Sequence, residues 1–237
     1  MTPEQLVEKL KQANPTGLKA VILYGSAAAG DHVGKRSDYN VLVVMDQLGL
    51  RELKLFLKPS EAWVKAGNAP PLLFTLEGLR QSADVFPIEL QDIRDSHRVL
   101  YGEDITGGIK INPENLRLQL EHELKGKVIQ LRERYLETGG KSKQLGDLMI
   151  NSLSSFLVLF RAALRLFQET VPPTKLEAVT QLTSHIPFDP GVFQTVEALK
   201  AGTKKLREVD AEELFERYLQ TIEAIVEAVD AHLCNKP

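Results

Sequence analysis

The chain has 237 residues, of which 29 are Lys or Arg and 32 are Asp or Glu, so its formal net charge is −3. A hydrophobic fraction of 43% is ordinary for a globular protein, which excludes a wholly disordered chain and predicts one or two domains. The single cysteine, Cys234, excludes a disulfide scaffold and fits a reducing, cytoplasmic location. The polar N-terminus lacks a signal-peptide pattern, and no uninterrupted apolar run reaches the roughly 18 residues of a spanning helix. We therefore expect no membrane association, and the slight acidity argues against broad nucleic-acid binding.

The first 110 residues alternate short apolar segments with helical patterns. Residues 21–24 and 41–45 are β-branched runs typical of buried strands, and residues 72–74 and 87–90 are weaker strand candidates. Helical patterns cover residues 50–66 and 76–83, and Pro59 is expected to interrupt the first of them or to begin a second helix at Ser60. This alternation predicts a domain of packed strands and helices over residues 1–110.

Residues 111–237 are predicted to be entirely helical. Between residues 116 and 131, leucine and valine recur at spacings of four and three, as on the buried face of an amphipathic helix, which Gly139 and Gly140 end. Short connections between successive helices predict antiparallel neighbours, and hence an up-and-down bundle. An apolar face of such a bundle can also form an interface in a homo-oligomer. The further helical patterns cover residues 145–167, 175–184, those after 190, and 211–233.

The segment from Tyr24 to residue 44, YGSAAAGDHVGKRSDYNVLVV, carries the candidate site. A strand ends at Tyr24, and Gly25 and Ser26 then open what is expected to be an alanine-rich helix. The glycine permits close backbone approach, and the serine hydroxyl joins the free N–H groups of a helix N-terminus, a combination that binds phosphate. Asp38 and Asn40 begin the next strand, where alternate residues point to one side. Oxygen-bearing side chains beside a phosphate site predict Mg²⁺ and a nucleoside triphosphate.

This pattern resembles the nucleotidyltransferase superfamily that includes DNA polymerase β and kanamycin nucleotidyltransferase. The family signature is a hydrophobic strand, Gly-Ser, a spacer, and Asp-x-Asp at the start of a second strand. The resemblance covers residues 18–101, and the helical half resembles the bundle that follows this domain in antibiotic nucleotidyltransferases. It implies an α+β fold, with a mixed β-sheet and flanking helices followed by an all-α helical bundle.

The resemblance also implies roles for the motif residues. Asp38 and Asn40 match the two metal-binding aspartates of the family, although the second of them is an amide here. Gly25 and Ser26 match the turn that holds the β and γ phosphates of the nucleotide. Magnesium is the implied cofactor, and a nucleoside triphosphate is the implied partner.

A third carboxylate completes the family's site from a later strand. Glu89, on the expected strand at residues 87–90, matches it as metal ligand or general base, with Asp92 as its substitute. The implied reaction is attack by the hydroxyl group of an acceptor on the α-phosphate of the nucleotide, with pyrophosphate leaving. The sequence identifies neither the acceptor nor the preferred base.

Two alternatives stay open. Asn40 brings no charge to a cation whose binding depends on ligand charge, so the chain can also be a catalytically degenerate module that binds a nucleotide or a protein partner. The spacing of Arg117 and His122 matches HEPN ribonucleases. That third interpretation requires the two side chains to meet at an exposed groove.

Overall fold

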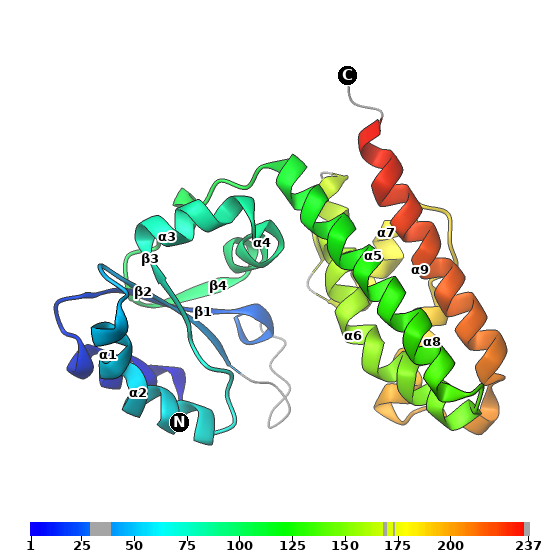
Figure 1. Ribbon diagram of the computed structural model, residues 1–237, viewed down its shortest axis with the longest axis horizontal. Coiled ribbons are helices and arrows are strands. Elements are labelled where there is room, and N and C mark those ends of the chain that lie inside the picture. The colour runs from blue at the N-terminus through cyan, green and yellow to red at the C-terminus, as the bar shows by residue number, and fades with distance from the viewer. Residues whose placement is uncertain (29–38, 168–169, 173, 235–237) are drawn as a thin grey trace. The chain divides into compact units, whose positions relative to one another are not determined.

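A computed structural model describes residues 1–28, 39–167, 170–172 and 174–234 (Figure 1). The chain divides into two compact units, Met1–Asn115 and Leu116–Pro237. The first unit contains α1 (Pro3–Ala13), β1 (Leu18–Tyr24), η1 (Gly25–Ala27), β2 (Asn40–Met45), α2 (Leu50–Lys65), β3 (Leu72–Thr75), α3 (Leu76–Gln81), η3 (Ser82–Asp84), α4 (Pro87–Asp95), β4 (His97–Gly102) and η4 (Thr106–Gly108). The remaining elements are α5 (Pro113–Thr138), which begins just before the division, α6 (Ser142–Leu166), α7 (Lys175–Leu182), α8 (Gly191–Ala201), η5 (Leu206–Glu208) and α9 (Ala211–Cys234).

The four strands form one mixed sheet in the order β3-β2-β1-β4. Strand β1 pairs antiparallel with β2 and β4, whereas β2 pairs parallel with β3. Helices α1 and α2 cover one face of the sheet, and α3 and α4 cover the other (Figure 1). The central strands are therefore buried on both faces, which explains their continuous apolar runs. The predicted strands at residues 21–24, 41–45 and 72–74 are confirmed.

Helix α2 continues through Pro59, so the prediction that this proline interrupts the helix is wrong. A proline inside a helix costs about 3 kcal/mol, because it removes a hydrogen bond and clashes with the preceding turn. Phe56, Pro59 and Trp63 lie on one face of α2 and are buried. Trp63 also donates its indole N–H to the Ala69 carbonyl, at 2.7 Å. Packing of this face against α1 and the sheet offsets the local cost.

The prediction of a strand at residues 87–90 is also wrong, because these residues begin helix α4. Pro87 occupies the first helical turn, where its fixed φ favours a helix and its missing N–H costs nothing. Leu90 and Ile93, three residues apart, are buried against the sheet. The fourth strand is instead β4, which lies at an edge of the sheet.

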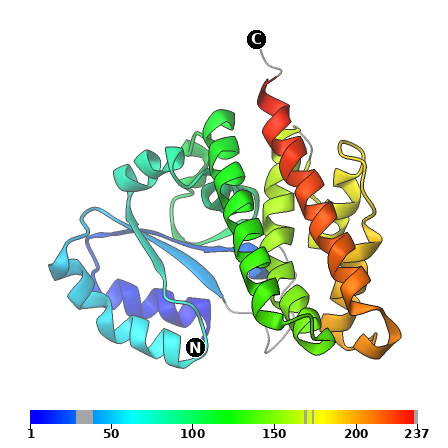
Figure 2. The same cartoon turned by 45° about the vertical axis from the view of Figure 1, so that its right-hand side comes forward.

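The second unit is a helical bundle, as predicted. Helix α6 packs against α7, α8 and α9, and α5 runs antiparallel to α9 (Figure 2). Phe156 and Phe160 of α6 contact Tyr218 of α9 and Phe193 of α8 edge-on. The cross-helix contacts that fix these directions are Lys125–Asp230, Arg132–Glu223, Ser152–Tyr218, Ser154–Lys200 and Leu166–His232. Helices α5, α6, α8 and α9 thus alternate in direction, and α7 is an additional short helix.

Helix α6 is, within the described residues, long and apolar enough to cross a membrane by length and composition. The sequence of α6 contains no uninterrupted apolar run of this length, because polar residues are scattered along the helix. In the structure 56% of its most apolar window is buried inside the helical bundle. Its position against three neighbouring helices accounts for its apolar composition.

Candidate functional site

The candidate site lies at the end of the central strand β1. Tyr24, the last residue of β1, pairs with Asn40 of β2 on one side and with His97 of β4 on the other. Residues directly opposite each other in antiparallel strands point to the same face. Tyr24 packs against the cluster that includes Leu90 of α4. The strand pairing therefore places Tyr24, Asn40 and His97 in a row on the face that α3 and α4 cover.

Gly25 turns the chain sharply after this strand. Its φ of +76° lies in the left-handed region, which glycine adopts at little cost. A Cβ at this position would lie 3.3 Å from Nδ2 of Asn40, so the Asn40 amide lies close to the turn. The turn that follows is a single 3-10 turn containing Ser26, closed by a 3.0 Å hydrogen bond from the Ala28 N–H to the Gly25 carbonyl. An alanine-rich helix was predicted here, and residues 29–38 lie outside the described part.

Asp38 also lies outside the described residues, so its predicted place beside Asn40 stays a prediction. Asn40 is the first residue of β2 and is half-buried. Its side chain shares a face with Leu42 and Val44, which contact α3 and α4. The amide is thus held on a buried strand rather than on a loose loop.

Glu89 lies in the first turn of α4, not on a strand, and its side chain is exposed. The helix N-terminus stabilises a negative charge at this position. Burial, and second to it the negative charge of Glu89, raise the pKa of Tyr24. Leu90, the next residue of α4, is buried in the cluster against which Tyr24 packs. Asp92 follows Glu89 by three residues on the same helix and is half-buried.

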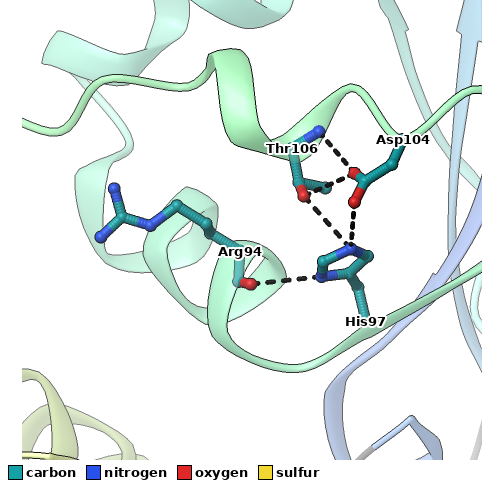
Figure 3. Close-up of polar contacts among 4 residues, drawn as sticks. All are labelled: Arg94, His97, Asp104 and Thr106. Atoms are coloured by element: carbon teal, nitrogen blue, oxygen red, sulfur yellow. Dashed lines mark hydrogen bonds and ion pairs between the residues drawn. The ribbon is translucent and has the colours of Figure 1, made fainter.

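A cluster that sequence reasoning missed surrounds His97 (Figure 3). Its Nδ1 lies 3.2 Å from the Arg94 carbonyl oxygen, and its Nε2 lies 3.2 Å from both Oδ2 of Asp104 and Oγ1 of Thr106. The hydroxyl and backbone N–H of Thr106 donate to Oδ1 of Asp104, at 2.7 and 2.9 Å. These bonds from Thr106, followed by the contact with His97, lower the pKa of Asp104. These residues do not have the sequence spacing of a metal site. The one signal in the sequence is that a His, an Asp and a Thr occur within ten residues.

Within the described residues, no group of three His, Cys, Asp or Glu side chains could hold a metal ion. Asp38 lies outside those residues, and the amide oxygen of Asn40 is a further type of ligand. Carboxylate and amide oxygens are ligands that Mg²⁺ accepts. Asn40 and Glu89, and Asp38 two residues before Asn40 in the sequence, are thus residue types whose oxygens Mg²⁺ accepts.

The pair proposed for an HEPN ribonuclease does not come together along α5. Arg117 instead forms an ion pair with Glu121, at 2.6 Å. Five residues of α-helix also rotate His122 by about 140° from Arg117. The site at the end of β1 is therefore the stronger candidate.

No protein-family model matches the sequence, and no curated protein sequence matches it. Among solved structures, the protein is similar to spectinomycin adenyltransferase AAD(9) from Enterococcus faecialis, solved with ATP and spectinomycin. The TM-score is 0.58 and the identity 12%, over 97% of this chain and 100% of that one. A toxin-antitoxin structure solved with AMP-PNP matches with a TM-score of 0.33 and 18% identity, over 55% of this chain and 99% of that one. The second score is too low to support a conclusion.

An identity of 12% with the adenyltransferase shows the fold and nothing finer. Both parts of that fold are present here: the mixed four-stranded sheet with flanking helices, and the helices that follow it. The Gly-Ser turn after β1 and Asn40 at the start of β2 stand where the sequence motif predicts them. The protein therefore has the nucleotidyltransferase fold.

Proposed function

We propose that the protein is a nucleotidyltransferase that moves a nucleoside monophosphate from a nucleoside triphosphate to a hydroxyl group of an acceptor. The observation that carries the proposal is the left-handed turn at Gly25 beside the Asn40 amide at the end of β1, in a fold that the chain shares with an adenyltransferase. In this fold, that combination supplies backbone N–H groups for phosphate and oxygen ligands for a cation.

The proposed reaction is an in-line displacement at the α-phosphorus. The acceptor oxygen forms a bond to this phosphorus while the bond to the β-phosphate oxygen breaks, and pyrophosphate leaves. The backbone of the turn at Gly25 and Ser26 would hold the departing phosphates. Glu89 would accept the proton of the acceptor hydroxyl, because its exposed carboxylate is accessible to the acceptor.

Asp38, Asn40 and Glu89 are the residues that would hold Mg²⁺. The bound ion would neutralise charge that develops on the phosphate oxygens. Asn40 contributes an oxygen but no charge, so the cation would depend on the two carboxylates. We therefore expect weaker metal binding than three carboxylates would give.

Asn40 and Glu89 also favour a second candidate function, that of a binding module without catalysis. Asn40 lacks the charge of the family's aspartate, and Glu89 is carried on a helix instead of the strand that the resemblance implies. A protein that still binds a nucleotide through the Gly25 turn but transfers nothing would have these features.

The identity of the acceptor is a separate proposal. The structural neighbour was solved with ATP and spectinomycin. ATP is thus the first nucleotide to try, and spectinomycin, which carries hydroxyl groups, is the first acceptor. Transfer of radiolabel from α-³²P-ATP to spectinomycin would separate the enzyme from the binding module.

Nucleotide binding is expected to require both Mg²⁺ and Asp38. Calorimetric titration of ATP and GTP into the wild-type protein should give heat with Mg²⁺ and little without it. Asp38→Ala should abolish the Mg²⁺-dependent heat, because one of only two charged ligands is lost. Asp46→Ala is the matched control, since Asp46 lies just beyond the opposite end of β2 and pairs with Lys19 on the surface.

An absence of binding in the folded wild-type protein would overturn the proposed function. Equal binding by Asp38→Ala and the wild-type protein would place the nucleotide elsewhere. Loss of binding in both the Asp38 and Asp46 variants would indicate a general effect on the fold.

A further inference from the structure

Helix α5 carries apolar side chains on two sides. Its buried leucines and valine pack inside the second unit. Leu118, Ile129 and Leu136 are instead exposed, by 54%, 54% and 77%. At 3.6 residues per turn, these three side chains lie within about 20° of one line along the helix, on the far side from most of its buried residues. Helix α5 thus has a second apolar face that the packing of the bundle does not use.

A groove of about 340 Å³ lies between α5 and α9 beside this exposed line (Figure 1). Its apolar lining comes from both helices, from Val128 and Ile129 of α5 and from Val226 of α9. Among the described residues that line it, the charged ones on α5 are basic and those on α9 are acidic. The groove therefore has an apolar centre, one basic wall and one acidic wall.

Two ion pairs fix the register of α5 against α9. Lys125 lies 3.1 Å from Asp230, and Arg132 lies 2.7 Å from Glu223, measured between nitrogen and oxygen. From the first pair to the second, α5 advances by seven residues and α9 goes back by seven. The two antiparallel helices therefore stay level with each other along the groove.

Apolar side chains occupy the levels between and beyond these ion pairs. By the same count, Ile129 is level with Val226, and Leu136 is level with Leu219. Val226 and Leu219 are half-buried, whereas their counterparts on α5 are exposed. The residues at successive levels are four, three and four positions apart on each helix, which is the spacing of the contact seam in helical bundles. The face thus alternates apolar levels with levels of paired charge.

We propose that this face of α5 and α9 binds a second copy of the chain, about a two-fold axis that runs along the groove. Such an axis keeps each level opposite the same level of the other copy. It also places α5 of one copy on α9 of the other, so the four helices form a bundle in which all neighbours are antiparallel. This dimer requires no nucleotide, so it goes beyond the proposed function and does not depend on it.

The charges of the face favour this arrangement and this partner. With the axis along the groove, Arg132 of each copy meets Glu223 of the other, and the apolar levels meet apolar levels. With the axis across the groove, α5 would lie on α5 and α9 on α9, so that each wall would face its own charge, which is unfavourable. The face is thus complementary to itself in charge and in apolar pattern, which a contact between identical copies requires.

The size of the face predicts a reversible dimer. From Leu118 to Leu136 the helix rises by about 27 Å, and two adjacent helices are about 20 Å wide, so the face of each copy covers about 540 Å². A standard stable interface buries about 800 Å² per partner. We therefore expect monomer and dimer in an equilibrium that depends on protein concentration.

Sedimentation equilibrium of the full chain tests the dimer. The mass should rise with protein concentration from the 26.4 kDa of one chain towards twice that value. Ile129→Glu should keep the mass at that of one chain, because it brings a carboxylate from each copy into an apolar level. The matched control is Leu57→Glu at an exposed leucine of α2, which should associate like the wild-type protein. A wild-type mass that stays at 26.4 kDa, or equal dissociation in the two variants, would overturn the proposal.

A charge exchange between Arg132 and Glu223 tests which residues face each other. Arg132→Glu makes all four charges of this level negative in a dimer, and Glu223→Arg makes all four positive, so each variant alone should stay monomeric. Both should fold, because each loses a surface ion pair that contributes little to stability. When the two variants are mixed, the acidic pair of one copy meets the basic pair of the other, and a heterodimer should form.

Fluorescence-detected sedimentation, with one of the two variants labelled, measures this heterodimer. Its appearance would support the axis along the groove, since no contact within one chain can produce it. Failure of the mixture to associate, under conditions in which the wild-type protein dimerises, would place the dimer contact elsewhere and overturn the proposal.

Discussion

Replacing Asn40 with Asp should raise the affinity of the protein for a Mg²⁺–nucleotide complex by at least about tenfold. Divalent cation binding depends on ligand charge, and the variant adds a third carboxylate to the proposed set. Changing a residue that only supports a metal ligand alters affinity by about 10–100-fold, so changing a ligand itself should do at least as much. Asp and Asn have nearly the same shape, so the substitution adds charge without adding bulk beside Gly25. Calorimetric titration with Mg²⁺ and ATP measures the change.

The matched control for this experiment is Asn14→Asp. Asn14 precedes β1 at the opposite end of that strand and accepts a hydrogen bond from the Gly17 N–H, which an aspartate can also accept. It adds the same charge to the same unit, away from the candidate site. An equal gain in both variants would reflect general electrostatic attraction, and no gain at Asn40 would show that its side chain does not face the cation.

Gly102→Ala should destabilise the first unit strongly. Gly102 has a φ of +77°, and a Cβ there would lie 1.9 Å from the Lys19 carbonyl oxygen of the neighbouring strand. The left-handed conformation costs an alanine about 1–2 kcal/mol. Because the clash is with backbone, β4 must move away from β1, which adds about 1–3 kcal/mol of overpacking cost. Urea unfolding followed by circular dichroism measures the decrease in the free energy of unfolding.

Gly67→Ala isolates the conformational part of this loss. Gly67 has a φ of +90°, but a Cβ there would meet nothing within 4 Å. The free energy of unfolding of Gly67→Ala should therefore fall only by the cost of the left-handed conformation. Equal losses in the two variants would contradict the close approach of β4 to β1 at Gly102.

Much of the fold follows from patterns that are strong in the sequence. Strands β1 and β2 are buried on both faces and appear as continuous apolar runs, and the buried leucines and valine of α5 recur at spacings of four and three from residue 116 to residue 131. Strand β4 was missed because it is a half-exposed edge strand that begins with His97 and Arg98. The short run at residues 87–90 fits a strand or a helix equally well, and only burial of Ile93, beyond the run, distinguishes them.

The candidate site was predicted in part. The sequence predicted a turn at Gly25 and a strand that begins with the polar residue Asn40. In the structure Gly25 begins the turn after β1, and Asn40 is the first residue of β2. Glu89 lies on a helix and not on the expected strand, and that helix, α4, packs through Leu90 and Ile93 on the face of the sheet to which Tyr24 belongs. The contacts of His97 could not be predicted, since they depend on how α4, β4 and η4 fold back on one another.

Mn²⁺, a paramagnetic substitute for Mg²⁺, can locate a metal–nucleotide site directly. In a ¹⁵N-labelled protein with ATP and a trace of Mn²⁺, the amide signals of Gly25 and Asn40 should broaden first. The amides of Gly17 and Asp46 lie at the opposite end of the same pair of strands and should stay sharp, because Asp46 is six residue steps, or about 20 Å, from Asn40, and Gly17 is eight residue steps from Gly25. Broadening at Gly17 and Asp46 with sharp signals at Gly25 and Asn40 would contradict a nucleotide site at the end of β1.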